Sequence, residues 1–199
     1  MSATVITYAA PVGRWEPDAR GRLLRAALDL FDTQGYEQTT TAQIAEAAGL
    51  TERTFFRHFT DKREVLFAGG PAYEELLTAA VAGAPPGATP WDAATAAAHA
   101  AAARIQEHPD GVVRRQRVIA SHPELQERDL AKNAGLAAAV VRALRERGTP
   151  DATAELAAAL ALTGLTVALR EWAHAGARGT LTSVLTRTLA GAEAISRPA

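Results

Sequence analysis

Residues 39–67 read TTTAQIAEAAGLTERTFFRHFTDKREVLF, and this stretch decides the fold. A helix-turn-helix needs small residues where its two short helices cross, a turn residue that tolerates positive φ, a cap on the second helix and a shared apolar core. One short window supplies all of these, as Ala45, Ala48, Gly49, Thr51, Ile44, Leu50 and Phe55. Two alanines alone would mean little in an alanine-rich chain, but the glycine, the cap and the aromatic residues make the pattern specific. We therefore predict a helix-turn-helix.

The composition favours helices throughout the chain. Of 199 residues, 48% are hydrophobic, and alanine is by far the commonest of them. Alanine loses no side-chain entropy in a helix, so an alanine-rich chain with few β-branched runs favours an all-α fold class. The length is sufficient for a real hydrophobic core.

The order of helical segments and loops divides the chain into regions. Residues 1–17 lack a helical period and contain two prolines, which predicts a flexible N-terminal arm. A helix should run from near Asp18 to Gly35, and another from near Asp61 to Ala82 with a break at residues 69–71. Further helices are expected over residues 91–108, 111–121, 124–147, 151–174 and 181–195.

Several classes of protein are excluded by what the sequence lacks. Without cysteine there is no disulfide, no Cys-ligated metal and no thiol nucleophile. No uncharged apolar run approaches the roughly 18 residues of a membrane span, and the N-terminus has no secretory pattern, so we expect a cytoplasmic protein. No HExxH, P-loop, GxSxG or GxGxxG motif is present at a sensible position, so we expect no enzyme, no catalytic residue, no cofactor and no metal site.

The quoted stretch, together with the preceding LFDTQGYEQTT at residues 30–40, resembles the DNA-binding segment of the tetracycline-repressor (TetR) family. The resemblance covers residues 18–67 and implies an all-α homodimer of about nine helices per chain. It implies a three-helix DNA-binding domain over residues 18–67 and a ligand-binding and dimerisation domain over residues 68–199. The function implied is a repressor that binds a palindromic operator and is released by a small-molecule effector. The alternatives are a DNA-binding dimer with no effector and, with less support, a helical enzyme.

Carried over position by position, the resemblance assigns DNA contacts to Thr40, Thr41, Thr51, Arg53, Thr54, Phe56, Arg57, His58 and Lys62. Arg53 and Arg57 lie one helical turn apart on one face, where arginine can bond guanine O6 and N7. The threonines and His58 are expected at phosphates, and Lys62 resembles a lysine that clamps a phosphate. Arg57→Ala should then reduce operator discrimination and Lys62→Ala should weaken all DNA binding, without unfolding, since both side chains are expected to be exposed.

Phe56 and the neighbouring Glu52 differ in their expected roles from the other residues of this stretch. Phe56 stands where the family usually has a tyrosine, so one phosphate bond is lost, although the ring can still touch a thymine methyl. Glu52 is interpreted as an acid that suits the first turn of a helix, without a role at the DNA.

The overall charge gives no sign of DNA binding. The net charge is −1, with 8 basic and 9 acidic residues up to residue 70 and 13 of each after it. Any DNA-binding surface must therefore be a local cluster, and base contacts must carry more of the operator preference.

The C-terminal region is interpreted mainly through the resemblance. The helices between Trp91 and Arg147 should surround a cavity for a hydrophobic or acyl-CoA-like effector, because residues 114–136 resemble an actinobacterial branch with such effectors. Candidate lining residues are Tyr73, Leu77, Trp91, His99, Arg114, Arg117, Val118 and Asn133. For the arginines of residues 114–117, a surface charge run is the preferred interpretation, and contact with an anionic group of the effector is the alternative.

The last two helices are expected to form the homodimer. Residues 151–174 are apolar around most of the helix, and Ala158, Ala161 and Gly164 would allow a partner helix to approach closely. A monomeric core is the alternative. The helix over residues 61–82 would be the lever between effector and DNA, with residues 69–71 as a hinge or a simple local break.

Overall fold

The computed structural model describes residues 18–195, so the proposed arm over residues 1–17 lies outside the described part. Within this part there are nine α-helices, one 3₁₀ segment and no strand, which confirms the all-α fold class. The N-terminal elements are α1 (Ala19–Gln34), α2 (Thr41–Ala47), α3 (Glu52–His58) and the 3₁₀ segment η1 (Glu64–Phe67). The remaining elements are α4 (Gly70–Ala82), α5 (Pro90–Ile105), α6 (Pro109–Ala120), α7 (Pro123–Glu146), α8 (Asp151–His174) and α9 (Leu181–Ile195).

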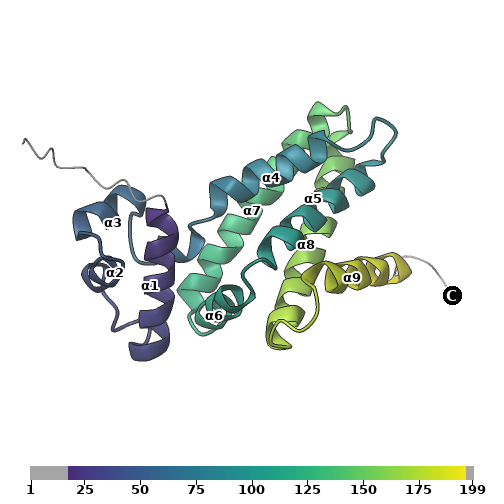
Figure 1. Ribbon diagram of the computed structural model, residues 1–199. Helices are drawn as coiled ribbons and strands as arrows, with labels where there is room; N and C mark the ends of the chain where they lie inside the picture. The colour runs from purple at the N-terminus through teal and green to yellow at the C-terminus, as the bar shows by residue number, and fades with distance from the viewer. Residues whose placement is uncertain (1–17, 196–199) are drawn as a thin grey trace, which may run out of the picture.

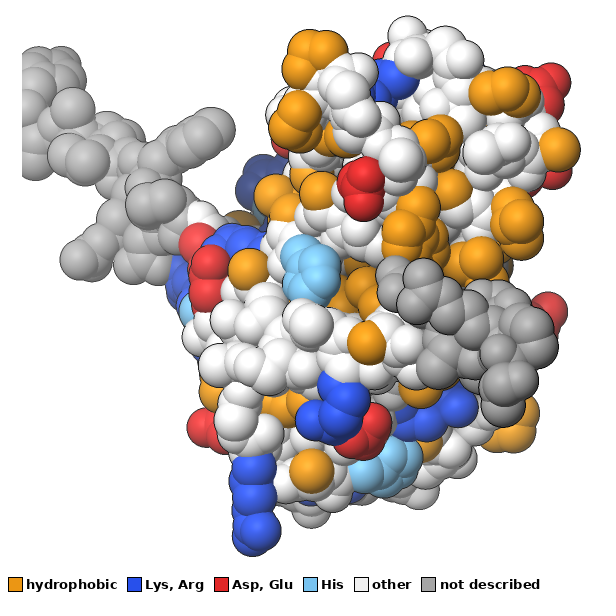
Figure 2. All heavy atoms as spheres, turned by 90° about the vertical axis from the view of Figure 1, so that its right-hand side faces the viewer, with side chains coloured by type: hydrophobic (Ala, Val, Ile, Leu, Met, Phe, Trp, Pro, Cys, Tyr) orange, Lys and Arg blue, Asp and Glu red, His pale blue; other side chains and the backbone are white. Residues whose placement is uncertain are grey.

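The helices group into a small head and a larger body (Figure 1). The head consists of α1, α2, α3 and η1, and the body of α4 to α9. Helices α4, α5, α7 and α8 pack side by side in the body, while α9 lies against α8 and α5. The connection at α6 returns to the head, where it contacts α1. Seen from the right-hand side of Figure 1, the surface carries both hydrophobic and charged side chains (Figure 2).

Local residue chemistry explains most helix boundaries. Asp18 caps α1, since its carboxylate accepts from the N–H of Gly21 at 2.8 Å. Three prolines lie just outside the expected helices over residues 91–108, 111–121 and 124–147, but each occupies the first position of a helix in the structure, where no N–H is needed. They are Pro90, Pro109 and Pro123.

The predicted helix from Asp61 to Ala82 is not continuous. The Asp61 carboxylate accepts from the backbone N–H groups of Arg63 and Glu64 at 2.8 and 3.1 Å, which forms a local turn. A short 3₁₀ segment follows instead of an α-helix, and α4 begins at Gly70 with Pro71 in its first turn. The break at residues 69–71 is confirmed, but it separates two different kinds of helix.

Two hydrophobic clusters hold the protein together. The body cluster contains many alanines, and α5 contributes six of them, all at most 1% exposed: Ala93, Ala94, Ala97, Ala98, Ala101 and Ala102. The head cluster gathers the apolar residues of α1, α2, α3 and η1, but it also includes Val118, Ile119 and Leu125 from α6 and α7. The head therefore shares its core with the body, and the predicted domain boundary after residue 67 stays a prediction.

Helix α8 combines a buried side with an exposed apolar side. By length and composition it could cross a membrane, with a mean hydropathy of 1.7, but core helices of soluble proteins meet the same test. The expectation of no membrane span concerned an uncharged apolar run of about 18 residues, which this test does not require. Ala158 and Ala161 are fully buried within the protomer, and a Cβ on Gly164 would meet a methyl of Leu189 at 2.6 Å. These small residues thus serve packing within the chain, including the approach of α9, rather than a partner's approach.

Candidate nucleic-acid interface

Helix α3 has one buried and one exposed side. Phe55 is fully buried and Phe59 nearly so, with ring centroids 5.5 Å apart. Arg53, Phe56 and Arg57 are exposed on the other side, with Phe56 at 53%. Burial of the two phenylalanines against α1 and α2 thus fixes which side chains α3 presents to solvent, and both predicted base-reading arginines are among them.

The turn between α2 and α3 has the predicted geometry. Gly49 adopts φ +67°, a left-handed conformation that other residues rarely adopt. The Arg22 guanidinium on α1 donates to the carbonyl of Ala48, which ties the turn to the first helix. Ile44 and Phe55 are fully buried and Leu50 is packed against them, so the predicted miniature core is present.

The predicted hydroxyl contacts are already used within the head. Thr51 caps α3 by accepting from the N–H of Thr54 at 3.2 Å, as predicted. Thr40 caps α2 in a reciprocal arrangement with Gln43. The Thr41 hydroxyl donates to Oε1 of Glu52 at 2.6 Å and links the two helices. These hydroxyls fix the helix-turn-helix, and contacts to DNA remain a prediction for them.

His58 lies at the end of α3 with its ring turned partly inward. Its Nε2 is buried and has no hydrogen-bond partner among residues 18–195. Burial lowers the pKa of His58, and the charges of Arg57 and Arg20 lower it further. The imidazole is therefore biased toward its neutral form in the absence of DNA.

Lys62 is a structural residue of the head. Its ammonium donates to the carbonyl oxygens of Tyr36, Glu37 and Thr39 at 2.7, 3.2 and 3.2 Å. It also lies 4.2 Å from the centroid of the Tyr36 ring. The expectation that Lys62 is exposed was wrong, because all three donors of an ammonium group hold the loop between α1 and α2. Its predicted phosphate contact would have to share or replace these bonds.

Tyr36 connects this loop to the body. Its ring packs against His122, in the turn between α6 and α7, with centroids 4.7 Å apart. Burial, followed by the nearby charge of Glu124, raises the pKa of Tyr36 to about 12. The phenol therefore stays neutral and acts as a packing residue between head and body.

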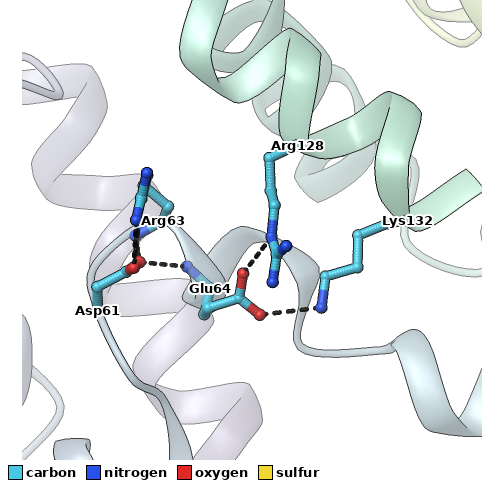
Figure 3. A network of polar contacts seen from close by, with 5 residues as sticks. All are labelled: Asp61, Arg63, Glu64, Arg128 and Lys132. Atoms are coloured by element: carbon cyan, nitrogen blue, oxygen red, sulfur yellow. Dashed lines mark hydrogen bonds and ion pairs between the residues drawn. The ribbon is translucent and has the colours of Figure 1, made fainter.

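Ion pairs join the head to α6 and α7, and Figure 3 shows those that involve α7. The Glu64 carboxylate accepts from Arg128 Nε at 2.6 Å and from Lys132 Nζ at 3.0 Å. Burial alone would raise the pKa of Glu64, but the hydrogen bonds from Arg128 and Lys132 outweigh it and lower the pKa below its usual value. On the other side of the junction, Arg114 pairs with Asp29 and Asp32 of α1.

A second arginine of α6 also reaches the head. Arg115 Nε donates to the carbonyl of Leu66 at 2.6 Å, and its guanidinium lies 5.0 Å from the centroid of the Phe67 ring. The interpretation of residues 114–117 as a surface charge run was therefore wrong for Arg114 and Arg115, while Arg117 is exposed. Sequence reasoning missed Glu64, Arg115 and Arg128, because nothing in a single sequence pairs residues so far apart.

The structure does not bring the eight candidate effector residues together. Leu77 is buried in the body cluster and Tyr73 packs against that cluster, whereas Val118 belongs to the head cluster. Arg114 pairs with α1, and Asn133 donates to Asp129 at 3.1 Å. Trp91 and His99 alone share a hollow, of about 280 Å³, which also involves Thr186 and Leu189 of α9. The predicted lining set therefore does not surround one cavity.

A larger hollow lies on the head. It measures about 490 Å³ and is lined by α1 and the turn after α2, including Arg22, Arg25 and Gly49. None of the eight candidate effector residues contributes to it.

Comparisons with known proteins agree with the geometry of the head. A family model described as bacterial regulatory proteins of the tetR family matches residues 23–68. The HTH-type transcriptional regulator TcmR of Streptomyces glaucescens is 44% identical over 88 residues, which are 44% of this chain and 39% of TcmR. The chain thus matches about two fifths of that relative's length.

Solved structures resemble the whole fold. The fatty acid degradation regulator FadR of Bacillus halodurans gives a TM-score of 0.63 at 14% identity, over 88% of this chain and 94% of that one. FadR of Thermus thermophilus, a TetR-family repressor solved in complex with lauroyl-CoA, gives 0.53 at 23% identity, over 86% and 91%. At such identities these similarities establish the fold.

Proposed function

We propose that the chain is a member of the TetR family of bacterial regulatory proteins, and that it regulates transcription as a dimer that binds operator DNA and responds to a small molecule. The observation that carries the proposal is the exposed side of α3, where Arg53 and Arg57 project from a helix held in place by buried phenylalanines. Each of two arginines one turn apart on a rigid helix can donate to O6 and N7 of a guanine in the major groove.

DNA binding is tested with the Arg57→Ala variant. We expect the wild-type protein to shift DNA from the promoter next to its own gene, and Arg57→Ala to discriminate that DNA from unrelated DNA about tenfold less. Arg178→Ala is the matched control, because Arg178 is an exposed arginine in the connection between α8 and α9. If both variants discriminate the promoter DNA from unrelated DNA equally well, Arg57 does not read bases. If the wild-type protein binds no DNA specifically, the proposed function is wrong.

The exposed side of α8 supports a dimer through the last two helices. Leu156, Leu160 and Val167 are 62%, 48% and 46% exposed and recur at helical spacing along one side. Apolar surface of this kind is typical of an interface, and a twofold dimer would place two recognition helices on successive major grooves, about 34–36 Å apart.

The dimer is tested by sedimentation of point variants. Leu160→Asp should convert the dimer to monomers at micromolar concentration, since it places a charge in the interface. Leu130→Asp is the control, because Leu130 on α7 is 70% exposed but lies on a different helix. A wild-type protein that sediments as a monomer would contradict the dimer.

The effector is proposed to carry an acyl chain. The support is the lauroyl-CoA complex of the Thermus thermophilus protein that shares this fold, together with the apolar body cluster. A series of acyl-CoAs of increasing length should raise the melting temperature of the purified protein and weaken its DNA binding. Binding of DNA that neither acyl-CoAs nor cell extract relieves would favour the alternative, a DNA-binding dimer without an effector.

We propose that the signal passes through α6 and α7 as well as through α4. Both helices contribute to the head cluster and carry Arg114, Arg128 and Lys132, which pair with the head. A displacement of α6 and α7 would therefore move the head directly. This extends the expectation that the segment over residues 61–82 is the lever.

A further inference from the structure

Glu52 at the start of α3 has a fixed position that a merely solvated carboxylate would lack. Its side chain is exposed, yet Oε1 accepts a hydrogen bond from the Thr41 hydroxyl of α2 at 2.6 Å. A favourable interaction with the first turn of α3 explains an acid at this position, but that interaction requires no bond to a neighbouring helix. The bond restricts the rotamers of Glu52 and holds its carboxylate between the two helices.

The carboxylate belongs to the same surface as the proposed base-reading arginines. Glu52 and Phe56 are one turn apart on α3, and Arg53 and Arg57 lie beside them, while Phe55 and Phe59 point into the head. A surface that meets DNA through these arginines therefore brings the Glu52 carboxylate to the DNA as well. The pairing with Thr41 uses Oε1 and leaves Oε2 able to accept a further hydrogen bond.

A carboxylate at a DNA surface is unfavourable unless it meets a donor, since every phosphate is an anion. In the major groove the donors are the exocyclic amines of cytosine and adenine, and acidic side chains pair with cytosine N4. Guanine O6 and thymine O4 are acceptors, so a carboxylate facing them would be repelled. The same group can therefore attract one base and reject others.

We infer that Glu52 is a specificity-determining residue that selects a cytosine in each half-site, with Thr41 as its positioning residue. This inference rests on the proposed DNA-binding function. Oε2 of Glu52 accepts from cytosine N4, while Arg53 or Arg57 pairs with a guanine nearby. Side chains of both charges then contact the operator bases. The negative charge of Glu52 acts mainly by weakening binding to sites with guanine or thymine at that position.

The test is a binding selection from randomised double-stranded DNA, followed by affinity measurements for single-base variants of the selected site. The wild-type protein should prefer a cytosine at one position of each half-site, with guanine or thymine at that position bound about tenfold or more weakly. Glu52→Ala should lose the preference at that position alone. Glu52→Gln should shift it toward adenine, because an amide pairs with adenine N6 and N7.

Two further variants separate specificity from charge and from structure. Glu46→Ala removes the same charge from an exposed position on α2 and should keep the cytosine preference. Thr41→Val removes the hydroxyl and keeps the carboxylate, so the preference should weaken without disappearing. Circular dichroism and melting curves establish that each variant is folded.

The outcomes distinguish this inference from the function on which it rests. If Glu52→Ala strengthens binding to all sequences equally and leaves the base preferences unchanged, Glu52 is only a repulsive charge and the inference is overturned. If the wild-type protein enriches no sequence at all, the DNA-binding function itself fails. Loss of one preferred base in Glu52→Ala, with the rest of the site unchanged, supports both.

Discussion

Arg128 donates a hydrogen bond from Nε to Oε1 of Glu64 at 2.6 Å, across a sequence separation of 64 residues. The bond joins a 3₁₀ segment of the head to a long helix of the body. Lys132, one turn further along α7, donates to the other oxygen of the same carboxylate. The position of the head therefore depends on contacts outside the segment that connects it to α4.

Glu64→Gln should lower the free energy of unfolding by about 1 kcal/mol. The estimate is modest because Arg128 and Lys132 are partly exposed, with side chains 43% and 36% accessible, so solvent screens the pairing. Urea denaturation followed by circular dichroism measures the change. Glu155→Gln removes a more exposed pair with Arg145 and should have almost no effect; equal losses in the two variants would contradict the special position of Glu64.

The contribution of Glu64 should depend on pH. Because the pKa of Glu64 is lower in the folded protein than its usual value, the unfolded chain binds the proton more readily. The stabilisation is then fully present above about pH 4.3, the unfolded value, and is lost as the pH falls through the folded pKa. The difference in unfolding free energy between wild type and Glu64→Gln should stay constant from pH 7 to pH 5 and shrink below pH 4. A difference that grows on acidification would have the wrong sign.

Lys62→Ala should destabilise the head by about 2 kcal/mol, the usual scale for hydrogen bonds from a charged group. The variant removes the donor to three carbonyl oxygens. Melting curves should show the loss, and Lys62→Arg should recover part of it, since arginine is also a cation with several donors. An unchanged melting temperature in Lys62→Ala would mean that water replaces these bonds at no cost.

Gly49→Ala should cost about 1–2 kcal/mol, because alanine is strained at positive φ. Gly49→Asn should cost less, since asparagine tolerates the left-handed region. A Cβ at this position would also lie 2.8 Å from the Arg22 guanidinium, which donates to the Ala48 carbonyl and would have to shift. If both variants melt at the same temperature, contact with Arg22 rather than backbone strain sets the cost.

Arg114→Ala should change DNA affinity although Arg114 lies in the body. Its removal leaves Asp29 and Asp32 of α1 without their partner and loosens the junction. Arg142→Ala is the control, because Arg142 pairs with Glu74 of α4 and both residues lie in the body. Titrations of labelled operator DNA should show a change of a few-fold for Arg114→Ala and none for Arg142→Ala.

The local structure was predictable where neighbouring residues determine it. The turn at Gly49, the cap at Thr51 and the bounds of α8 all follow from spacing and from residue type, and they agree with the structure. The association of Val118 with the head core was not predictable, because it depends on how α6 folds back onto α1. For the same reason Lys62 was expected in solvent, although the loop it holds ends more than 20 residues earlier in the chain.

Helix α5 has a consequence for how a guest molecule could enter the body. Its buried positions are alanines, which have no side-chain torsion that could swing aside to open a space. Leucine or methionine in these places could make room by changing rotamer, but a methyl group cannot. The α5 side of the core can therefore yield space only if the helix itself moves, and any room made by a rotamer change must come from larger neighbours such as Leu77 of α4 and Leu185 of α9.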